Sequence, residues 1–161
     1  MRKMILIGVM CASWGLVMNA TTVVHDGYSV DVTRVLTGLC PFPVTEHETG
    51  DVHDALFFDD AGNLVRVLET LRHFGTTYTA NGVTLEARVT GGLDFTFNPD
   101  GTIGSFSIFG INNLLTIPHD GAVFLNTGVR KGVFDPTPQL VFQAGPLEFD
   151  IPAFCAALSG E

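Results

Sequence analysis

Basic residues are scarce in this sequence. Its 161 residues include eight Lys and Arg together, and lysine occurs only at Lys3 and Lys131. Nucleic-acid binding depends on Lys and Arg side chains that neutralise phosphates, and attachment to an anionic membrane surface uses the same charges. With a formal net charge of −9, the chain is repelled by both kinds of surface. We therefore expect neither nucleic acid nor membrane lipid as a partner.

Catalytic motifs are lacking as well. The sequence contains no Gly-x-Ser-x-Gly elbow and no glycine pattern that would cradle a phosphate. His25, His73 and His119 stand alone, without a nucleophile or a carboxylate at a spacing typical of catalysis. We therefore assign no catalytic residue and no cofactor, and the sequence favours a non-enzymatic protein.

The composition is that of a folded chain. Charged residues make up only 16% and apolar residues 46%, with 13 phenylalanines. Disordered chains instead combine many charges with few aromatic residues. The length is typical of one domain and is sufficient to bury a sizeable core.

The first twenty residues have the pattern of a secretory signal peptide. Arg2 and Lys3 precede the apolar stretch from Met4 to Met18, and Ala20 is a suitable residue before a cleavage site. The predicted organisation is therefore a signal peptide over 1–20 and a single β-domain over 21–161, secreted to the extracellular space. Its six basic and 17 acidic residues would give the mature chain a net charge of −11. The alternative is an uncleaved N-terminal anchor.

Two cysteines remain once Cys11 is removed with the signal peptide. In an exported chain such a pair, here Cys40 and Cys155, indicates a disulfide. Closing a loop of this length stabilises the fold by about 4–5 kcal/mol in the chain-entropy model. The alternative is a pair of unrelated buried thiols.

Between the two cysteines, short alternating apolar segments are separated by turn residues. Asn81-Gly82 and Asn98 to Gly101 are strong turn signals, and Gly91-Gly92 is read as a third turn. Val83 to Val89 and Leu93 to Phe97 alternate apolar and polar residues with the period of a β-strand.

Other segments are less clearly patterned. Thr21 to Leu39 has both strand and helix periodicity and stays undecided, and Glu46 to Asp54 is read as a polar loop. Leu64 to Thr79 is interpreted as one long strand bent at Gly75, and a helix over Leu64 to Phe74 is the alternative. Ile151 to Leu158, with Pro152 near its start, predicts a short C-terminal helix.

Successive hairpins without intervening helices predict an all-β protein, an antiparallel meander with a short C-terminal helix. Because open sheet edges invite aggregation, we expect the meander to close as a barrel-like domain. A β-sandwich is the alternative.

Several of these motifs carry a resemblance to a family of small exported proteins. They are Cys40-Pro41-Phe42-Pro43-Val44, Tyr78 to Gly82, the turn from Asn98 to Gly101, and Cys155 followed by Ala156-Ala157-Leu158. In these features the chain resembles exported actinobacterial β-domain proteins of unknown function. The resemblance covers roughly residues 40–158. It implies the same β-fold and the Cys40–Cys155 disulfide, and it implies no activity.

The sequence offers one candidate metal site. His47, His53 and Asp51 lie in the acidic segment from Glu46 to Asp54, and two imidazoles with a carboxylate suit zinc or another divalent ion. The competing interpretation is an ordinary solvated acidic loop.

The phenylalanines suggest a candidate ligand pocket. Phe95, Phe97, Phe106 and Phe109 would line an apolar cavity if a barrel closed with spare volume. The competing interpretation is that they fill the core.

The favoured function is that of a secreted, non-enzymatic β-domain acting as a binding or extracellular interaction or assembly module, with an unknown protein as partner. The alternative is a carrier of a small apolar ligand. A metal-dependent enzyme is a weaker alternative.

Overall fold

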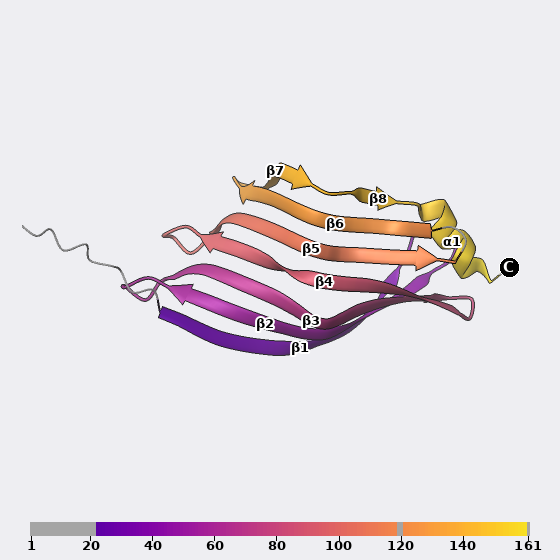
Figure 1. Cartoon of the computed structure of the whole chain (residues 1–161), viewed down its shortest axis with the longest axis horizontal. Helices are drawn as coiled ribbons and strands as arrows, with labels where there is room; N and C mark the ends of the chain where they lie inside the picture. Colours follow the sequence, from indigo (N-terminus) through magenta and orange to yellow (C-terminus); the bar gives the residue numbers. More distant parts are fainter. Residues whose placement is uncertain (1–21, 119–120, 161) are drawn as a thin grey trace, which may run out of the picture.

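The protein is one long antiparallel sheet followed by a helix (Figure 1). The computed structural model describes residues 22–118 and 121–160, so the predicted signal peptide lies outside the described residues. Strands β1 to β7 are neighbours in chain order. β8 follows β7 along the same edge and pairs with another part of β6. The elements are β1 (Thr22–Leu36), β2 (Val44–Phe58), β3 (Leu64–Ala80), β4 (Val83–Phe97), β5 (Ile103–Ile117), β6 (Gly121–Phe134), β7 (Pro138–Ala144), β8 (Leu147–Phe149) and α1 (Ile151–Ser159).

The predicted all-β meander with a C-terminal helix is confirmed, but the sheet does not close into a barrel. Closure would require β1 to pair with the last strands, whereas β1 and β7 lie at opposite edges (Figure 1). The far edge is built from β7, of seven residues, and β8, of three, so neither matches the 15 residues of β1. The predicted sandwich is not found either, since the described strands form a single sheet.

Two turns form where the sequence predicts them. Asn81 and Gly82 both have positive φ, 50° and 79°, which is the conformation that joins β3 to β4 with a two-residue turn. Between β4 and β5, the amide of Gly101 donates to the carbonyl of Asn98 at 2.9 Å. Both turns are encoded by adjacent residues alone.

The strands are longer than the sequence pattern predicts. Glu46 to Asp54, expected to be a loop, lies within β2, and the undecided segment from Thr21 to Leu39 contains β1. Gly91-Gly92 is not a turn but lies inside β4. The expectation of one long strand from Leu64 to Thr79 agrees with β3, whose register against β4 shifts between Leu71 and Gly75.

The first glycine of the expected turn, Gly91, belongs to a row of glycines that crosses the sheet. Gly91 pairs with Gly110, and Gly110 pairs with Gly128 on the next strand. A Cβ atom on Gly110 would lie 2.4 Å from the carbonyl oxygen of Thr90 and 2.6 Å from the Cα atom of Gly91. Neighbouring backbones therefore approach so closely that only glycine fits.

Elsewhere phenylalanine rings cover glycines on adjacent strands. A Cβ atom on Gly132 would meet the ring of Phe106 at 2.2 Å, and one on Gly50 would meet the ring of Phe74 at 2.6 Å. These cross-strand contacts bury aromatic surface in a sheet that has no second sheet packed on it in the described residues.

The core lies where α1 packs on one end of the sheet. Phe154 and Leu158 of α1 are fully buried, as are Leu115 and Val44. The centre of the Phe154 ring lies 5.2 Å from the centre of the Tyr78 ring in edge-on geometry, and the Phe154 ring also contacts Phe124. We call the face of the sheet that carries Tyr78 and Phe124 the helix face.

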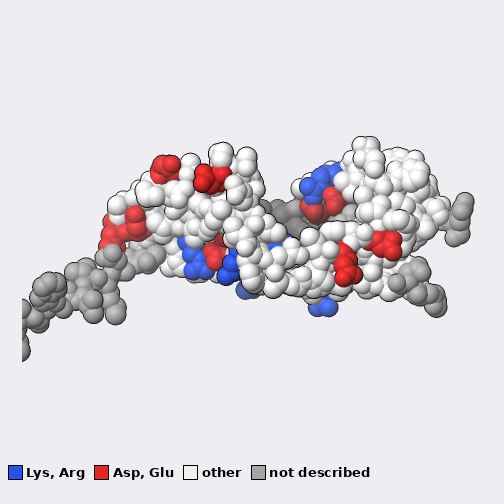
Figure 2. Space-filling view, turned by 90° about the horizontal axis from the view of Figure 1, so that it is seen from above, with Lys and Arg blue, Asp and Glu red and all other residues white. Residues whose placement is uncertain are grey.

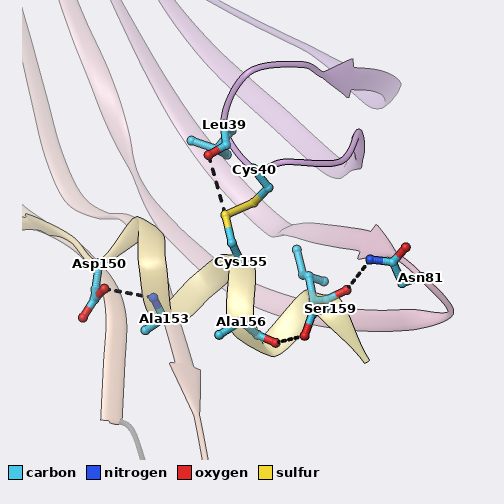
Figure 3. Close-up of a disulfide and its surroundings, with 9 residues drawn as sticks. Leu39, Cys40, Asn81, Asp150, Ala153, Cys155, Ala156 and Ser159 are labelled. Atoms are coloured by element: carbon cyan, nitrogen blue, oxygen red, sulfur yellow. Dashed lines mark hydrogen bonds between the residues drawn. A yellow bond between two sulfur atoms is a disulfide. The ribbon is translucent and has the colours of Figure 1, made fainter. Parts of the chain in front are cut away.

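A disulfide and a side-chain cap hold α1 in this position (Figure 3). The predicted Cys40–Cys155 bond is confirmed, with the two Cα atoms 5.5 Å apart. At the start of α1, the carboxylate of Asp150 accepts from the amide of Ala153, as an N-cap does. At its end, the side-chain amide of Asn81 donates to the carbonyl of Leu158 at 3.0 Å. The turn between β3 and β4 therefore also anchors the helix.

Among the described residues, no helix has the length and apolar character needed to cross a bilayer.

Candidate functional site: the open edges of the sheet

The exposed large hydrophobic side chains of the described residues are confined to the two edges of the sheet. They number ten, and all of them belong to β1, β7 or β8. They are Val23, Val24, Tyr28, Val32 and Val35 on β1, Leu140, Val141 and Phe142 on β7, and Leu147 and Phe149 on β8. No large hydrophobic residue of the described parts of β2 to β6 is exposed to this extent.

These edge side chains are exposed over a large part of their surface. Val35 has 62% of its surface accessible and Val141 has 63%, and every residue of β7 and β8 is exposed. An isolated exposed apolar side chain needs no explanation, but a contiguous exposed group marks an interaction site. An edge strand also presents unpaired backbone N–H and C=O groups along its outer side.

The edge formed by β7 and β8 is interrupted. Pro138 begins β7 and Pro146 lies between the two strands, and proline has no N–H to donate to an added strand. Gly145 has a φ of 100°, which bends the chain at the same point. Figure 2, viewed from the side on which β7 and β8 lie in Figure 1, shows a mostly uncharged surface with scattered acidic and basic groups.

The edge formed by β1 is continuous. Its 15 residues contain neither proline nor lysine, the two residues that most often protect an edge strand. Pairing with β2 runs from Thr22 opposite Phe58 to Leu36 opposite Val44 without a register shift. All β1 residues except Val30 and Leu36 are exposed, so β1 is the longer and less protected of the two edges.

Charges along β1 are unevenly distributed. Near one end, Arg34 makes ion pairs with Glu46, at 2.9 Å, and with Glu48, yet half of its side chain stays exposed. Near the other end, Asp26, Asp54 and Glu69 are cross-strand neighbours on β1, β2 and β3. We call these three the carboxylate row; within the described residues none of them has an ion-pair partner.

The carboxylate row is electrostatically unfavourable in the isolated chain. Burial raises the pKa of Asp54, and the nearby Asp26 raises it further, while His53 has the opposite effect. Burial also raises the pKa of Glu69, with a contribution from Asp54. One oxygen of Asp54, Oδ1, is buried without a hydrogen-bond partner in the described structure. A cation placed beside this row would relieve the repulsion.

The four phenylalanines of the predicted pocket do not line one cavity. Phe95 and Phe106 are directly opposed on β4 and β5, so they share a face of the sheet. Phe109 is opposed to Gly92, the neighbour of Leu93 on β4. Because Phe109 follows Phe106 by three positions, an odd number, it projects from the other face of the sheet. Phe97 lies at the end of β4, opposite Ile103. The open sheet encloses no lumen between them.

The residues of the predicted metal site lie along one strand. His47 and His53 are six positions apart on β2, which in a strand corresponds to about 20 Å. His47 is hydrogen-bonded through Nε2 to Asp31 at 2.8 Å, and Asp51 accepts from the hydroxyl of Ser29 at 2.9 Å. The described residues contain no cluster of three or more His, Cys, Asp or Glu suited to a metal ion.

The exposure of the two edges was not predicted from the sequence, although Gln139 to Phe142 was expected to form the last strand. Val32, Val35 and Leu36 fit a helix as well as a strand, so β1 stayed undecided, and β8 gave no recognised signal. The absence of proline and lysine from Thr22 to Leu36 was the available signal for an unprotected strand. It becomes informative only once β1 is known to lie at an edge.

Comparison with known proteins yields no match: no protein-family model, curated protein or solved structure is similar to this sequence. The resemblance of residues 40–158 to exported actinobacterial proteins therefore stays a prediction.

Proposed function

We propose that this protein is an exported, non-enzymatic interaction or assembly module that binds its partners by strand addition at the open edges of its sheet. The observation that carries the proposal is the confinement of all ten exposed large hydrophobic side chains to β1, β7 and β8. Strand addition supplies backbone hydrogen bonds, and the flanking side chains supply apolar contact and specificity.

The β1 edge is composed for contact rather than for protection. Soluble β-proteins usually shield an edge with lysine, proline, a bulge or a covering helix. Here the described chain has a single lysine, Lys131, and it lies on β6 rather than on β1, β7 or β8. α1 packs over the core at one end of the sheet and leaves Val23, Val24, Val32 and Val35 of β1 exposed.

Two features support export. The sequence predicts a signal peptide over residues 1–20, and the Cys40–Cys155 disulfide is of a kind that forms and persists in oxidising compartments. The proposed location is therefore extracellular.

The carrier and metal-enzyme alternatives have less support. A carrier requires an enclosed apolar cavity, whereas β1 and β7 lie apart at opposite edges of an open sheet. A metal site requires ligands around one point, whereas His47 and His53 lie far apart along β2.

Native mass spectrometry of the protein collected from the culture medium tests the proposal. We expect the chain to begin near Thr21, to be two mass units lighter than the reduced chain because of one disulfide, and to occur in complexes heavier than a single chain. Release of a small apolar molecule on denaturation would instead support the carrier.

Edge substitutions locate the contact surface. Val32→Lys on β1 and Val141→Lys on β7 place a charge on each edge in turn, and we expect at least one of them to dissociate the complexes. Thr84→Lys is the matched control, because Thr84 is exposed on β4, which has strands on both sides. Far-ultraviolet circular dichroism verifies that each variant is folded.

The proposal is overturned if the wild-type protein occurs only as a single bare chain. It is also overturned if complexes form but neither edge substitution weakens them more than Thr84→Lys does.

A further inference from the structure

We propose that two copies of this chain pair through β1, antiparallel to one another, about a two-fold axis that passes beside Val30 and is normal to the sheet. The inference rests on the proposed function, because it names the edge that is used and the partner that occupies it. In the dimer the two sheets become one continuous sheet, and each β1 becomes an interior strand.

β1 has the length and regularity that such pairing needs. Residues 24–36 of the two copies would be opposed over about 40 Å, with about a dozen backbone hydrogen bonds between them. No proline interrupts the donors in this range, in contrast to the edge containing Pro138 and Pro146. Pairing between two β1 strands therefore satisfies more backbone groups than pairing that involves β7 and β8.

The symmetry restricts the register. A two-fold axis normal to the sheet keeps the helix faces of both copies on the same side. Opposed residues of the two β1 strands must then project from the same face, which requires that they be an even number of positions apart. Val30 opposed to itself satisfies this condition and lies one position beyond Ser29, the midpoint of β1.

In this register the β1 side chains on the helix face are opposed by complementary side chains of the second copy. Val24 is opposed to Leu36 of the second copy and Tyr28 to Val32 of the second copy, so apolar residues meet apolar residues. Asp26 is opposed to Arg34 of the second copy, and the two-fold axis repeats each of these pairs. Cross-strand pairs of these kinds stabilise a sheet.

Neighbouring registers do not match. Centring the axis on Asp31 opposes Asp31 to itself, and like charges directly opposite one another destabilise a strand pair. Centring it on Ser29 opposes Asp26 to Val32 and Arg34 to Val24, so that each charge faces a valine. Of these registers, only the one centred on Val30 places opposite charges in opposition.

The ion pairs across the axis would place a cation beside the carboxylate row, which has none within one copy of the described structure. The carboxylate row of Asp26, Asp54 and Glu69 ends at the β1 edge without a cation in the described structure. Arg34 is half exposed although it contacts Glu46 and Glu48. Pairing brings Arg34 of the second copy to the exposed end of the row. This local complementarity opposes the general repulsion between two acidic chains.

Disulfide cross-linking tests the register in the full chain with Cys11 replaced by Ser. Val30→Cys places two thiols at directly opposed positions, where Cα separations of about 4.5–5.5 Å suit a disulfide. We expect Val30→Cys to give a covalent dimer on mild oxidation and Val32→Cys alone to give none. Mixing Tyr28→Cys with Val32→Cys should give a mixed covalent dimer.

A charge exchange tests the pairing independently of cysteine chemistry. Asp26→Arg and Arg34→Asp should each raise the dimer dissociation constant, measured by sedimentation velocity, by about tenfold, because each change places two like-charged pairs across the axis. The double variant restores both pairs in reversed orientation and should recover most of the affinity. Thermal unfolding of the variants that carry Arg34→Asp measures the separate loss of the Arg34 contacts to Glu46 and Glu48 within one copy.

The outcomes separate this inference from the proposed function. A dimer whose Val32→Cys variant cross-links as readily as Val30→Cys, or whose double charge variant stays dissociated, overturns the register. A wild-type chain that is monomeric at its highest soluble concentration overturns self-pairing. If that monomeric chain still forms edge-dependent complexes with another exported protein, the proposed function stands without this inference; if it forms none, both fall.

Discussion

Cys155 on α1 is bonded to Cys40, which lies 115 positions earlier in the loop between β1 and β2. The bond joins the last element of the chain to the connection between the first two strands. It lies beside the core residues Phe154 and Leu158, which are the side chains of α1 that are fully buried against the sheet. The edge strand β1 is therefore tied through its following loop to the best-packed part of the molecule.

Removing this bond should destabilise the fold strongly. For Cys40→Ser combined with Cys155→Ser, we expect the free energy of unfolding to fall by up to about 4–5 kcal/mol, since a loop of more than a hundred residues is freed in the unfolded chain. Urea unfolding followed by circular dichroism measures the change. The oxidised and reduced forms of the wild-type protein are the matched comparison, and equal midpoints for the two would contradict the expected stabilisation.

The glycine row should tolerate no side chain. In Gly110→Ala the new Cβ atom would lie 2.4 Å from the Thr90 carbonyl oxygen, at a residue whose φ is 100°. We expect a loss of at least about 2 kcal/mol in the free energy of unfolding, because the clash is with backbone that has no other position to take.

Gly75→Ala is the control for this substitution. Nothing lies within 4 Å of the position that a Cβ atom on Gly75 would take. Its unfolding midpoint should stay close to that of the wild type or rise slightly, because alanine restricts the unfolded chain. Similar losses at the two positions would show that the close approach at Gly110 is not what requires glycine there.

The sequence predicts those parts of the fold that adjacent residues encode. Asn81-Gly82 forms a tight turn because both residues accept positive φ, and Asp150 caps α1 through its own side chain. The same reasoning fails at Gly91-Gly92, where glycine is required because a Cβ atom would meet the carbonyl oxygen of Phe109 or of Glu69 on a neighbouring strand. Whether a glycine pair turns the chain or accommodates a neighbour depends on a contact distant in sequence.

The open edges could not be predicted for a related reason. Val23, Val32 and Val35 would be equally suitable in a closed barrel, where a neighbouring strand would cover them. Their exposure follows from the end of the meander, where β7 and β8 are too short and too interrupted by proline to pair with β1. That outcome is decided by strands more than a hundred residues away.

Tyr78 should make the protein sensitive to alkali. Its side chain is 4% exposed, and burial raises its pKa to about 12, although the hydrogen bond donated by Asn113 at 2.8 Å has the opposite effect. An unfolded tyrosine ionises near pH 10. As the pH rises from about 10 to about 12, the unfolded chain releases this proton while the folded chain retains it, so stability is lost over that range, by up to about 3 kcal/mol.

Tyr78→Phe isolates this effect. The variant has no phenol to ionise, so its free energy of unfolding should fall less than that of the wild type, by about 1.4 kcal/mol less for each pH unit above about pH 10. Urea unfolding at a series of pH values measures the difference between the two proteins. Parallel pH profiles above pH 10 would contradict the proposed role of the Tyr78 proton.

The ionised carboxylate of Glu69 should destabilise the folded chain, whereas a carboxylate in an ion pair stabilises it. Burial raises its pKa, and Asp54 adds to the shift, so the folded chain holds the Glu69 proton at pH values where the unfolded chain has released it. Stability attributable to this group therefore falls as the pH rises from the pKa of the unfolded glutamate to the raised pKa of the folded one. Above that range the full cost in stability remains.

Glu69→Gln should consequently raise the melting temperature by a few degrees at neutral pH and leave it unchanged in acid, where both states are protonated. Glu86→Gln is the control, since Glu86 is exposed on β4. Equal changes in the two variants, or a loss of stability in Glu69→Gln at neutral pH, would show that the carboxylate row is not a source of repulsion in the folded chain.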